Sequence, residues 1–173
     1  MRPSSSQSLL VLGGARSGKS RYAQRRAEDG PGELVFVATA QPLDDEMAAR
    51  IARHQADRDM RWRTVEAPLD LAGIIASQAM AGRTLLIDCL TLWASNLMFA
   101  EHDIDSEIDR LVTALAGAPG RTILVANEVG LGIVPDNALA RRFRDVAGQI
   151  NQAVAAVVDE AVFLAAGLPL KLK

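Results

Sequence analysis

One segment near the start of the chain has the residue types and spacing of a phosphate-binding loop. The pattern G-x-x-x-x-G-K-[ST] is satisfied at every position by Gly13, Gly14, Ala15, Arg16, Ser17, Gly18, Lys19 and Ser20. Glycines let the backbone curl until its N–H groups point at phosphate oxygens, and a helix starting near Lys19 adds its positive dipole end. In such loops the lysine reaches the β- and γ-phosphates, and a hydroxyl at the Ser20 position binds Mg²⁺. The segment therefore predicts a nucleoside triphosphate site rather than a chance glycine turn.

Asp88 is the second candidate for phosphate chemistry, because it ends a short apolar run, Leu85-Leu86-Ile87. An acid at the end of a buried strand would hold Mg²⁺ or a magnesium-bound water beside the phosphates. Many buried strands end in aspartate, so the pattern is informative only together with the phosphate loop. The neighbouring Cys89 is interpreted as a small packed residue rather than a redox group.

His54 is the third candidate, and it lies in a densely charged segment, 44–58, that is expected to be helical. Residues 46, 50, 54 and 58 are spaced by four, so they would form one polar stripe with Arg50 and Arg58 a turn away from the imidazole on each side. Such a stripe suits an imidazole that must meet a phosphate. It is equally typical of a solvated helix face held by salt-bridging pairs, and the residues alone leave both interpretations open.

Alternating strands and helices are expected to position these candidates. Continuous apolar runs, typical of strands buried on both faces, lie at 9–12, 34–37, 85–87 and 122–126, with a last or edge strand at 161–164. Helical periodicity is found at 19–28, 44–58, 69–81, 104–116 and 138–159. This alternation predicts a single α/β domain with a mostly parallel sheet flanked by helices. Residues 62–66 form a further possible strand, on which Glu66 could bind a ribose or base or face solvent.

The composition excludes several other classes of protein. A chain of 173 residues with 49% hydrophobic and 23% charged residues is expected to fold as one globular domain. A net charge of −2 gives no positive electrostatic field to attract nucleic-acid phosphates. With 4% aromatic residues, the chain also has too few rings to stack on the bases of a single strand. The apolar runs are too short for a membrane span or a signal peptide, so a cytoplasmic protein is expected. The domain is predicted to cover 9–173, after a disordered polar tail at 1–8.

Taken together, the motifs resemble one enzyme family, the bifunctional adenosylcobinamide kinase / adenosylcobinamide-phosphate guanylyltransferase of cobalamin biosynthesis. The phosphate loop is shared with many NTPases, but the other motifs are not, and they follow the family's order from Leu9 to Lys173. These motifs are Ala38-Thr39-Ala40, Asp45-Glu46-Met47 with Arg50-Ile51 and His54, Trp62-x-Thr64-x-Glu66, Asp88-Cys89-Leu90-Thr91, Asn127-Glu128-Val129-Gly130-x-Gly132-Ile133-Val134-Pro135, Phe143-Arg144-Asp145 and Gly148-x-x-Asn151-Gln152.

The resemblance implies a RecA-like P-loop NTPase domain and a role for each matched residue. His54 would be the nucleophile that becomes guanylylated, Lys19 a catalytic residue of the loop, and Ser20 and Asp88 the ligands of Mg²⁺. The nucleotide site would also be lined by Ala38, Thr39, Ala40, Gln55, Ala56, Asp57, Arg58, Glu66 and Asp88. The implied substrates are ATP, GTP, adenosylcobinamide and adenosylcobinamide phosphate. Members of the family can assemble as trimers, so a homo-oligomer is expected.

Some features stay open at this stage. The Asn127-Glu128 segment follows a strand, where it would position substrate or magnesium or form a structural turn. The chain departs from the family in its longer polar tail and in a short segment at 99–105. Without the resemblance, two other functions fit the residues. One is a kinase for another small metabolite, for which His54 is dispensable, and the other is a nucleotide-dependent switch or ATPase subunit without transfer chemistry.

Overall fold

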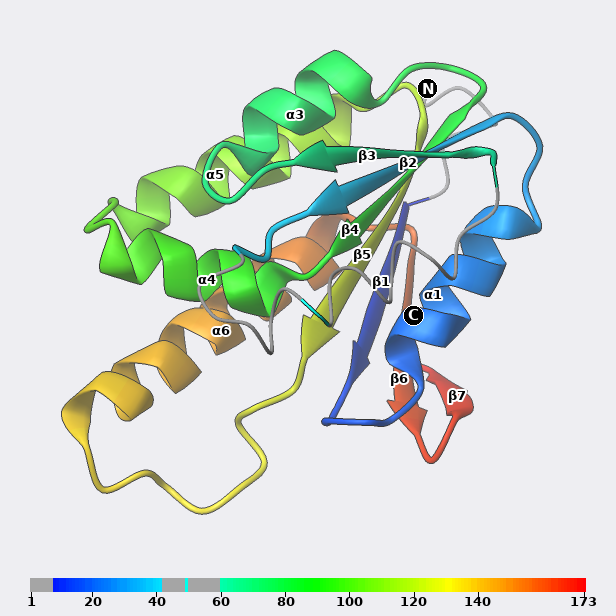
Figure 1. Cartoon of the computed structure of the whole chain (residues 1–173). Coiled ribbons are helices and arrows are strands. Elements are labelled where there is room, and N and C mark those ends of the chain that lie inside the picture. Colours follow the sequence, from blue (N-terminus) through cyan, green and yellow to red (C-terminus); the bar gives the residue numbers. More distant parts are fainter. Residues whose placement is uncertain (1–7, 42–48, 50–59) are drawn as a thin grey trace.

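A computed structural model of the chain describes residues 8–41, 49 and 60–173 (Figure 1). Along the chain the elements are β1 Ser8–Gly13, α1 Lys19–Glu28, β2 Glu33–Ala38, β3 Trp62–Glu66, α3 Leu71–Gln78, β4 Arg83–Asp88, α4 Leu90–Phe99, α5 Ile104–Gly117, β5 Arg121–Asn127, α6 Ala138–Val157, β6 Glu160–Ala165 and β7 Leu168–Lys171. In this part of the chain no helix is long and apolar enough to cross a membrane.

The strands form one seven-stranded sheet in the order β3-β2-β4-β5-β1-β6-β7. Every neighbouring pair is parallel except β6 and β7, which form an antiparallel hairpin at one edge. The predicted α/β fold with a mostly parallel sheet is confirmed. Because parallel strands end at the same side of the sheet, the carboxyl ends of β1 to β5 meet there (Figure 1).

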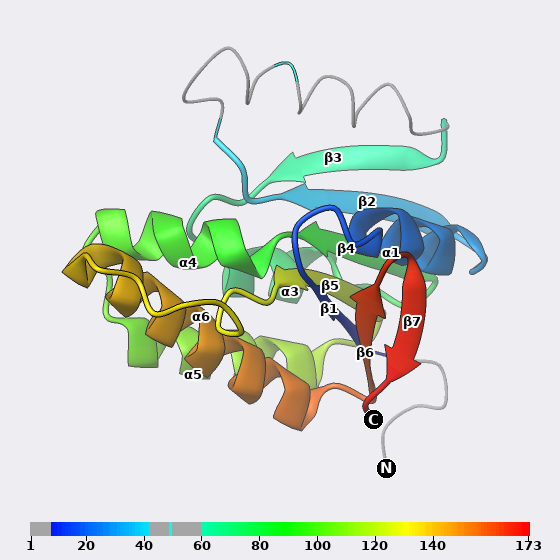
Figure 2. The same ribbon diagram turned by 90° about the horizontal axis from the view of Figure 1, so that it is seen from below.

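Two hydrophobic cores lie on opposite faces of this sheet, because successive side chains of a strand point to opposite sides. Leu10 and Leu12 of β1 belong to the larger core, which is closed by α3, α4, α5 and α6 and contains the fully buried Trp93. Leu9 and Val11 belong to the smaller core, which is closed by α1. Figure 2 shows the four helices gathered on one side of the sheet and α1 on the other. Helices therefore flank both faces, as predicted.

The structure contains two elements that were not predicted, and several predicted elements begin or end at other residues. Helix α4 and strand β7 were not expected, and β6 is therefore not the edge strand. Helix α4 is hard to recognise because it is apolar on most sides and follows β4 after a single residue. Ser8 belongs to β1 rather than to the polar tail, since its N–H and hydroxyl donate to Asp159 Oδ2 at 2.8 and 2.9 Å. Helix α3 covers Leu71–Gln78 instead of 69–81. The predicted tail at 1–7 and helix at 44–58 lie outside the described residues, apart from residue 49.

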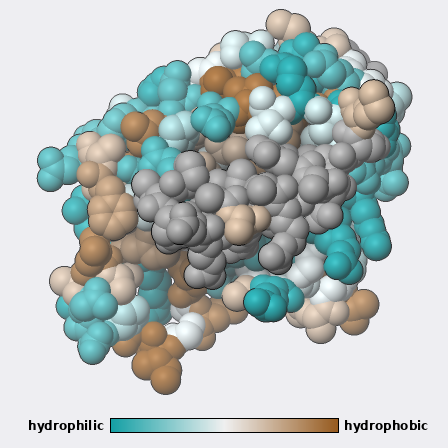
Figure 3. All heavy atoms as spheres, viewed as in Figure 1, coloured by the Kyte–Doolittle hydropathy of each residue, from teal (hydrophilic) through white to brown (hydrophobic). Residues whose placement is uncertain are grey.

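An apolar patch is exposed where the β5–α6 loop and the ends of two helices meet. It consists of Phe99, Leu131, Ile133, Val134 and Leu139, whose exposed fractions range from 56% to 98%. Figure 3 shows apolar side chains gathered at the lower left, over the loop and the start of α6. Phe99 and Leu139 also line one shallow groove between α4 and α6. Exposed apolar side chains that gather on one face in this way are typical of an interaction site.

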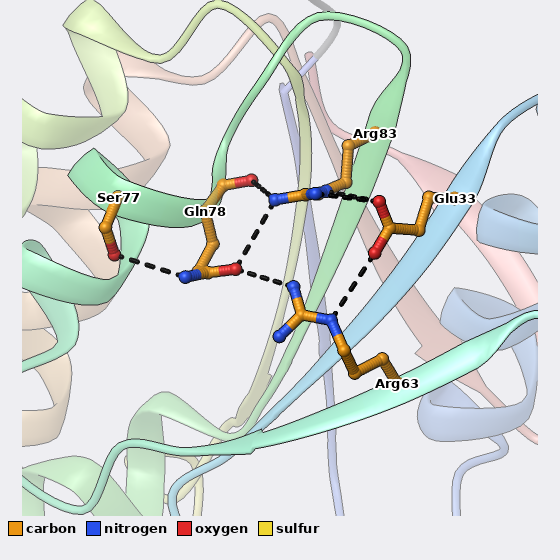
Figure 4. Close-up of polar contacts among 5 residues, drawn as sticks. All are labelled: Glu33, Arg63, Ser77, Gln78 and Arg83. Carbon is orange, nitrogen blue, oxygen red and sulfur yellow. Dashed lines mark hydrogen bonds and ion pairs between the residues drawn. The ribbon is translucent and has the colours of Figure 1, made fainter.

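The opposite end of the sheet is held by an exposed polar network (Figure 4). The carboxylate of Glu33 accepts from Arg83 at 2.7 Å and from Arg63 at 3.4 Å, so it joins the starts of β2, β4 and β3. Gln78 Oε1, at the end of α3, accepts from Arg63 at 2.6 Å. The hydrogen bond from Arg83 lowers the pKa of Glu33. This network is structural and lies remote from the carboxyl ends of the strands.

Candidate functional site

The phosphate loop joins β1 to α1 with the backbone shape that its glycines predict. Gly18 caps the helix with a φ of 91°, in the left-handed region that glycine adopts without strain. At Gly13 a Cβ atom would lie 2.5 Å from Ser17 Oγ and 2.8 Å from the carbonyl oxygen of Leu164, so only glycine fits. Lys19 Nζ donates to the carbonyl of Gly14 at 3.0 Å, which holds the ammonium group over the loop.

Ser17 indicates that this loop is built to bind a polar group. Its side chain is buried, and among the described residues Ser17 Oγ is one of two buried side-chain polar atoms without a hydrogen-bond partner. An unpaired buried hydroxyl is costly and calls for an explanation. A phosphate oxygen entering the loop would supply the missing partner.

The predicted site residues of four strands come together at one edge of the sheet. The strand register places Glu66 opposite Ala38 and Ala38 opposite Asp88, so these three residues form one row across β3, β2 and β4. Strand β5 lies between β4 and β1, and its Asn127 pairs with Gly13. Asp88 is level with Val125 and therefore with Val11, two residues before Gly13. Two strand spacings of about 4.8 Å and two residue rises of about 3.3 Å therefore place Asp88 roughly 12 Å from the start of the phosphate loop. That separation leaves room for a triphosphate and its cation.

Thr39 is buried against the backbone of Asp88 and Cys89 and is not exposed to solvent. Its side chain is fully buried, and its Oγ1 accepts from the N–H of Cys89 and donates to the carbonyl of Cys89, each at 2.8 Å. The N–H of Thr39 also donates to the carbonyl of Asp88 at 3.3 Å. The hydroxyl is thus committed to the backbone that follows Asp88. A contact of Ala38, Thr39, Ala40 or Glu66 with nucleotide stays a prediction.

Cys89 is a packed residue with an unreactive thiol. It is buried, and its Sγ accepts from the N–H of Leu92 at 3.4 Å at the start of α4. Burial, with a smaller contribution from the charge of Asp88, raises the pKa of Cys89 to about 11. The thiol is therefore protonated at neutral pH, in agreement with the interpretation from the sequence.

The Asn127-Glu128 segment lies directly beside the phosphate loop. The N–H of Asn127 donates to Thr91 Oγ1 at 2.7 Å, and the N–H of Glu128 donates to the carbonyl of Gly13 at 3.0 Å. Glu128 Oε1 accepts from the N–H of Gly130 at 2.5 Å. Both residues therefore form a structural turn at the end of β5, and this turn is hydrogen-bonded to Gly13 at the start of the phosphate loop. A further role of Glu128 toward substrate or magnesium stays a prediction.

Asn96 is a site residue that the sequence analysis missed. Its Nδ2 donates to the carbonyl of Thr39 at 2.8 Å and to the carbonyl of Pro68 at 2.9 Å. It therefore joins the chain just after β2 to the chain just after β3. A polar amide within an otherwise apolar segment, 90–99, is the signal that could have identified it.

The donor set suits a magnesium ion that is bound together with a nucleotide. Among the residues that the structure describes, no group of three His, Cys, Asp or Glu side chains could hold a metal by itself. Mg²⁺ is commonly bound through one or two protein oxygens together with substrate phosphates and water. Ser20 and Asp88 would supply such oxygens. His54, Gln55, Ala56, Asp57 and Arg58 lie outside the described residues, so their predicted roles stay predictions.

Comparison with known proteins places the whole chain in one group of relatives. A family model described as cobinamide kinase / cobinamide phosphate guanyltransferase matches residues 9–172. The bifunctional adenosylcobalamin biosynthesis protein CobP of Pseudomonas aeruginosa is 50% identical over 166 residues, covering 95% of this chain and 96% of that protein. CobU of Salmonella typhimurium, with the same description, is 43% identical over 180 residues, covering 95% of this chain and 99% of that protein.

Solved structures with little sequence identity share the fold. The KaiC-like protein PH0186 of Pyrococcus horikoshii superposes with a TM-score of 0.52 at 16% identity, over 91% of this chain and 70% of that one. The PH0250 protein of the same organism superposes with a TM-score of 0.54 at 10% identity, over 96% of this chain and 86% of that one. These likenesses concern the fold alone.

Proposed function

The chain belongs to the cobinamide kinase / cobinamide phosphate guanyltransferase family, and from that membership we propose a two-step mechanism with a guanylyl-histidine intermediate. In the first step, ATP or GTP phosphorylates adenosylcobinamide. In the second step, GMP passes from GTP to His54 and then to adenosylcobinamide phosphate, which yields adenosylcobinamide-GDP. The observation that carries the proposal is the convergence of the phosphate loop, Asp88 and the ends of β2 and β3 at one edge of the sheet.

In the kinase step, the aminopropanol hydroxyl of adenosylcobinamide forms a bond to the γ-phosphorus. The bond from this phosphorus to the bridging oxygen breaks, the nucleoside diphosphate leaves, and the hydroxyl loses its proton. Lys19 and the N–H groups of the loop would stabilise the charge on the transferring group. Ser20 and Asp88 would hold Mg²⁺, which neutralises phosphate charge when bound.

In the guanylyl step, the neutral imidazole of His54 attacks the α-phosphorus of GTP, and pyrophosphate leaves. An unperturbed imidazole pKa of about 6.5 provides a free nitrogen at neutral pH. A phosphate oxygen of adenosylcobinamide phosphate then attacks the same phosphorus and releases the histidine, so one difficult transfer becomes two easier ones.

We also propose that the chain assembles as a homotrimer. The apolar patch of Phe99, Leu131, Ile133, Val134 and Leu139 supports an interface, because exposed apolar surface of this kind is stabilised by burial. Light scattering on the purified protein tests this, with three times the monomer mass expected. A monomer at all concentrations would contradict it.

Labelled GTP tests the catalytic proposal. With adenosylcobinamide, label from γ-labelled GTP should move to the corrinoid. Without adenosylcobinamide, label from α-labelled GTP should remain on the protein, and adding adenosylcobinamide phosphate should then remove it. Transfer of γ-label without any α-labelling would leave a small-molecule kinase. GTP hydrolysis that no cobinamide affects would instead indicate a nucleotide-dependent switch.

A further inference from the structure

The turn of the C-terminal hairpin touches the phosphate loop. Ala166 and Gly167 connect β6 to β7, and the N–H of Gly167 donates to the carbonyl of Ser17 at 2.8 Å. A Cβ atom on Gly18 would lie 3.2 Å from the Cα atom of Gly167, so the two backbones are in close contact. Three residues before Gly167, the carbonyl oxygen of Leu164 lies next to Gly13, where a Cβ atom would be 2.8 Å from it.

The turn has the backbone that a tight hairpin requires. Ala166 has a φ of 52° and Gly167 a φ of 78°, and two positive φ values in a two-residue connection are typical of a type I′ turn. Glycine at the second position is free of strain, and nothing lies within 4 Å of a Cβ atom built there. The glycine is therefore required by the backbone conformation and not by crowding.

The hydrogen bond from Gly167 fixes one peptide group of the phosphate loop. The peptide between Ser17 and Gly18 is planar and trans, so its carbonyl and its N–H point in opposite directions. Because the carbonyl of Ser17 points at the hairpin, the N–H of Gly18 must point away from it. Backbone N–H groups of a phosphate loop are the groups that bind phosphate oxygens.

We propose that Gly167 is a positioning residue for the nucleotide, which holds the Ser17–Gly18 peptide so that the N–H of Gly18 faces the phosphates. The hairpin thus forms the outer support of the phosphate loop. This proposal deepens the proposed function and rests on nucleotide binding at the loop. It assigns a role in nucleotide binding to the hairpin of β6 and β7. Within the sheet, the edge strand β7 pairs only with β6.

Calorimetric titration with GDP tests this role in Gly167→Ala, Gly167→Asn and Gly82→Ala. Gly82 is a matched control, since it also has a φ of 78° and open space around a Cβ atom, and it lies at the amino end of β4. Alanine keeps the N–H but is strained at this positive φ, so the turn should shift and lose the hydrogen bond to Ser17, and GDP binding should weaken by up to roughly fivefold, the effect of one hydrogen bond. Gly167→Asn should bind within about twofold of the wild type, because asparagine tolerates the left-handed conformation. Gly82→Ala should lower the Tm similarly and leave the affinity unchanged.

Lys19→Ala in the same titration separates the two proposals. If Lys19→Ala binds GDP as tightly as the wild type, the loop is not the nucleotide site and the proposed function fails together with the role of Gly167. If Lys19→Ala binds weakly while Gly167→Ala binds normally, only the role of Gly167 is overturned. Equal weakening by Gly167→Ala and Gly82→Ala would also overturn it, because it would show a general loss of stability.

Discussion

Thr39 holds Cys89 through both backbone polar groups of that residue, with the hydroxyl accepting from its N–H and donating to its carbonyl at 2.8 Å each. The two residues lie on the chain just after β2 and β4, which are neighbours in the sheet. Thr39 is fully buried and Cys89 is buried, so solvent does not reach this contact. It therefore fixes the backbone on which the carboxylate of Asp88 is carried.

Thr39→Val should impair magnesium-dependent turnover. The isosteric change leaves the buried N–H of Cys89 without a partner, which costs about 1–3 kcal/mol, whereas the carbonyl of Cys89 keeps its hydrogen bond from the N–H of Trp93. We expect a lower Tm and a higher magnesium concentration for half-maximal kinase activity. Thr39→Ser should restore both values, because serine keeps the hydroxyl. Thr122→Val, a buried threonine at the other end of the sheet, serves as the control and should leave the magnesium requirement unchanged.

Lys19→Ala should abolish both activities, because both reactions are proposed to use one phosphate loop. Loss of a preorganised contact to the transition state typically costs about 3–4 kcal/mol, or 10²–10³ in rate. Initial rates of phosphorylation and of guanylyl transfer measure the effect in the folded variant. Lys171→Ala, on the exposed strand β7, is the control. Normal guanylyl transfer by Lys19→Ala would restrict the loop to the kinase step.

His54→Ala should lose guanylyl transfer and keep much of the kinase activity, since Lys19, Ser20 and Asp88 remain. In the wild type, α-labelled GTP and magnesium should label the protein through an acid-labile, base-stable bond and release pyrophosphate. Labelling should fall as the pH drops below about 6.5, because a protonated imidazole has no lone pair for attack. A His54→Ala variant that takes up label normally would remove the guanylyl-histidine from the mechanism.

Glu160→Gln should destabilise the protein at neutral pH and not at low pH. Glu160 accepts from Arg26 at 2.7 and 3.1 Å, and this hydrogen bond lowers the pKa of Glu160 in the folded state. A carboxylate with a lowered folded-state pKa stabilises above its unfolded pKa of about 4.3 and loses this effect as the pH falls through the folded value. For a partly exposed pair we expect up to about 1 kcal/mol at pH 7.

Urea unfolding of wild type and Glu160→Gln at several pH values measures this difference. The two proteins should converge as the pH falls below the folded pKa of Glu160. The exposed Glu101→Gln gives the baseline for removing a carboxylate. A difference between wild type and Glu160→Gln that does not change with pH would show that the effect comes from packing.

Cys89 should resist alkylation in the native protein. Burial raises its pKa to about 11, so at pH 8 only about one thiol in a thousand is ionised, and its side chain is nearly inaccessible. Iodoacetamide should therefore label the urea-unfolded chain rapidly and the folded chain very slowly, as followed by intact mass. Fast labelling of the folded chain would show that the backbone around Asp88 opens readily.

The sequence by itself determined the features that are encoded locally. The continuous apolar runs at 9–12, 34–37, 85–87 and 122–126 predicted central strands, because strands buried on both faces lack polar alternation. The phosphate loop was evident from eight consecutive residues, since its backbone shape depends on its own glycines. The motif order was enough to indicate the family, which the relatives confirm.

Only the tertiary structure decided which strands are neighbours and which residues support the site. That Asp88 lies two strands away from the phosphate loop follows from the strand order, which local patterns do not encode. Thr39 pairs with Cys89 across 50 positions, and Gly167 contacts Ser17 from the far end of the chain. These contacts are one or two hydrogen bonds between distant segments and therefore leave no periodic pattern in the sequence. They form because folding of the sheet brings the chain after each strand to the same edge.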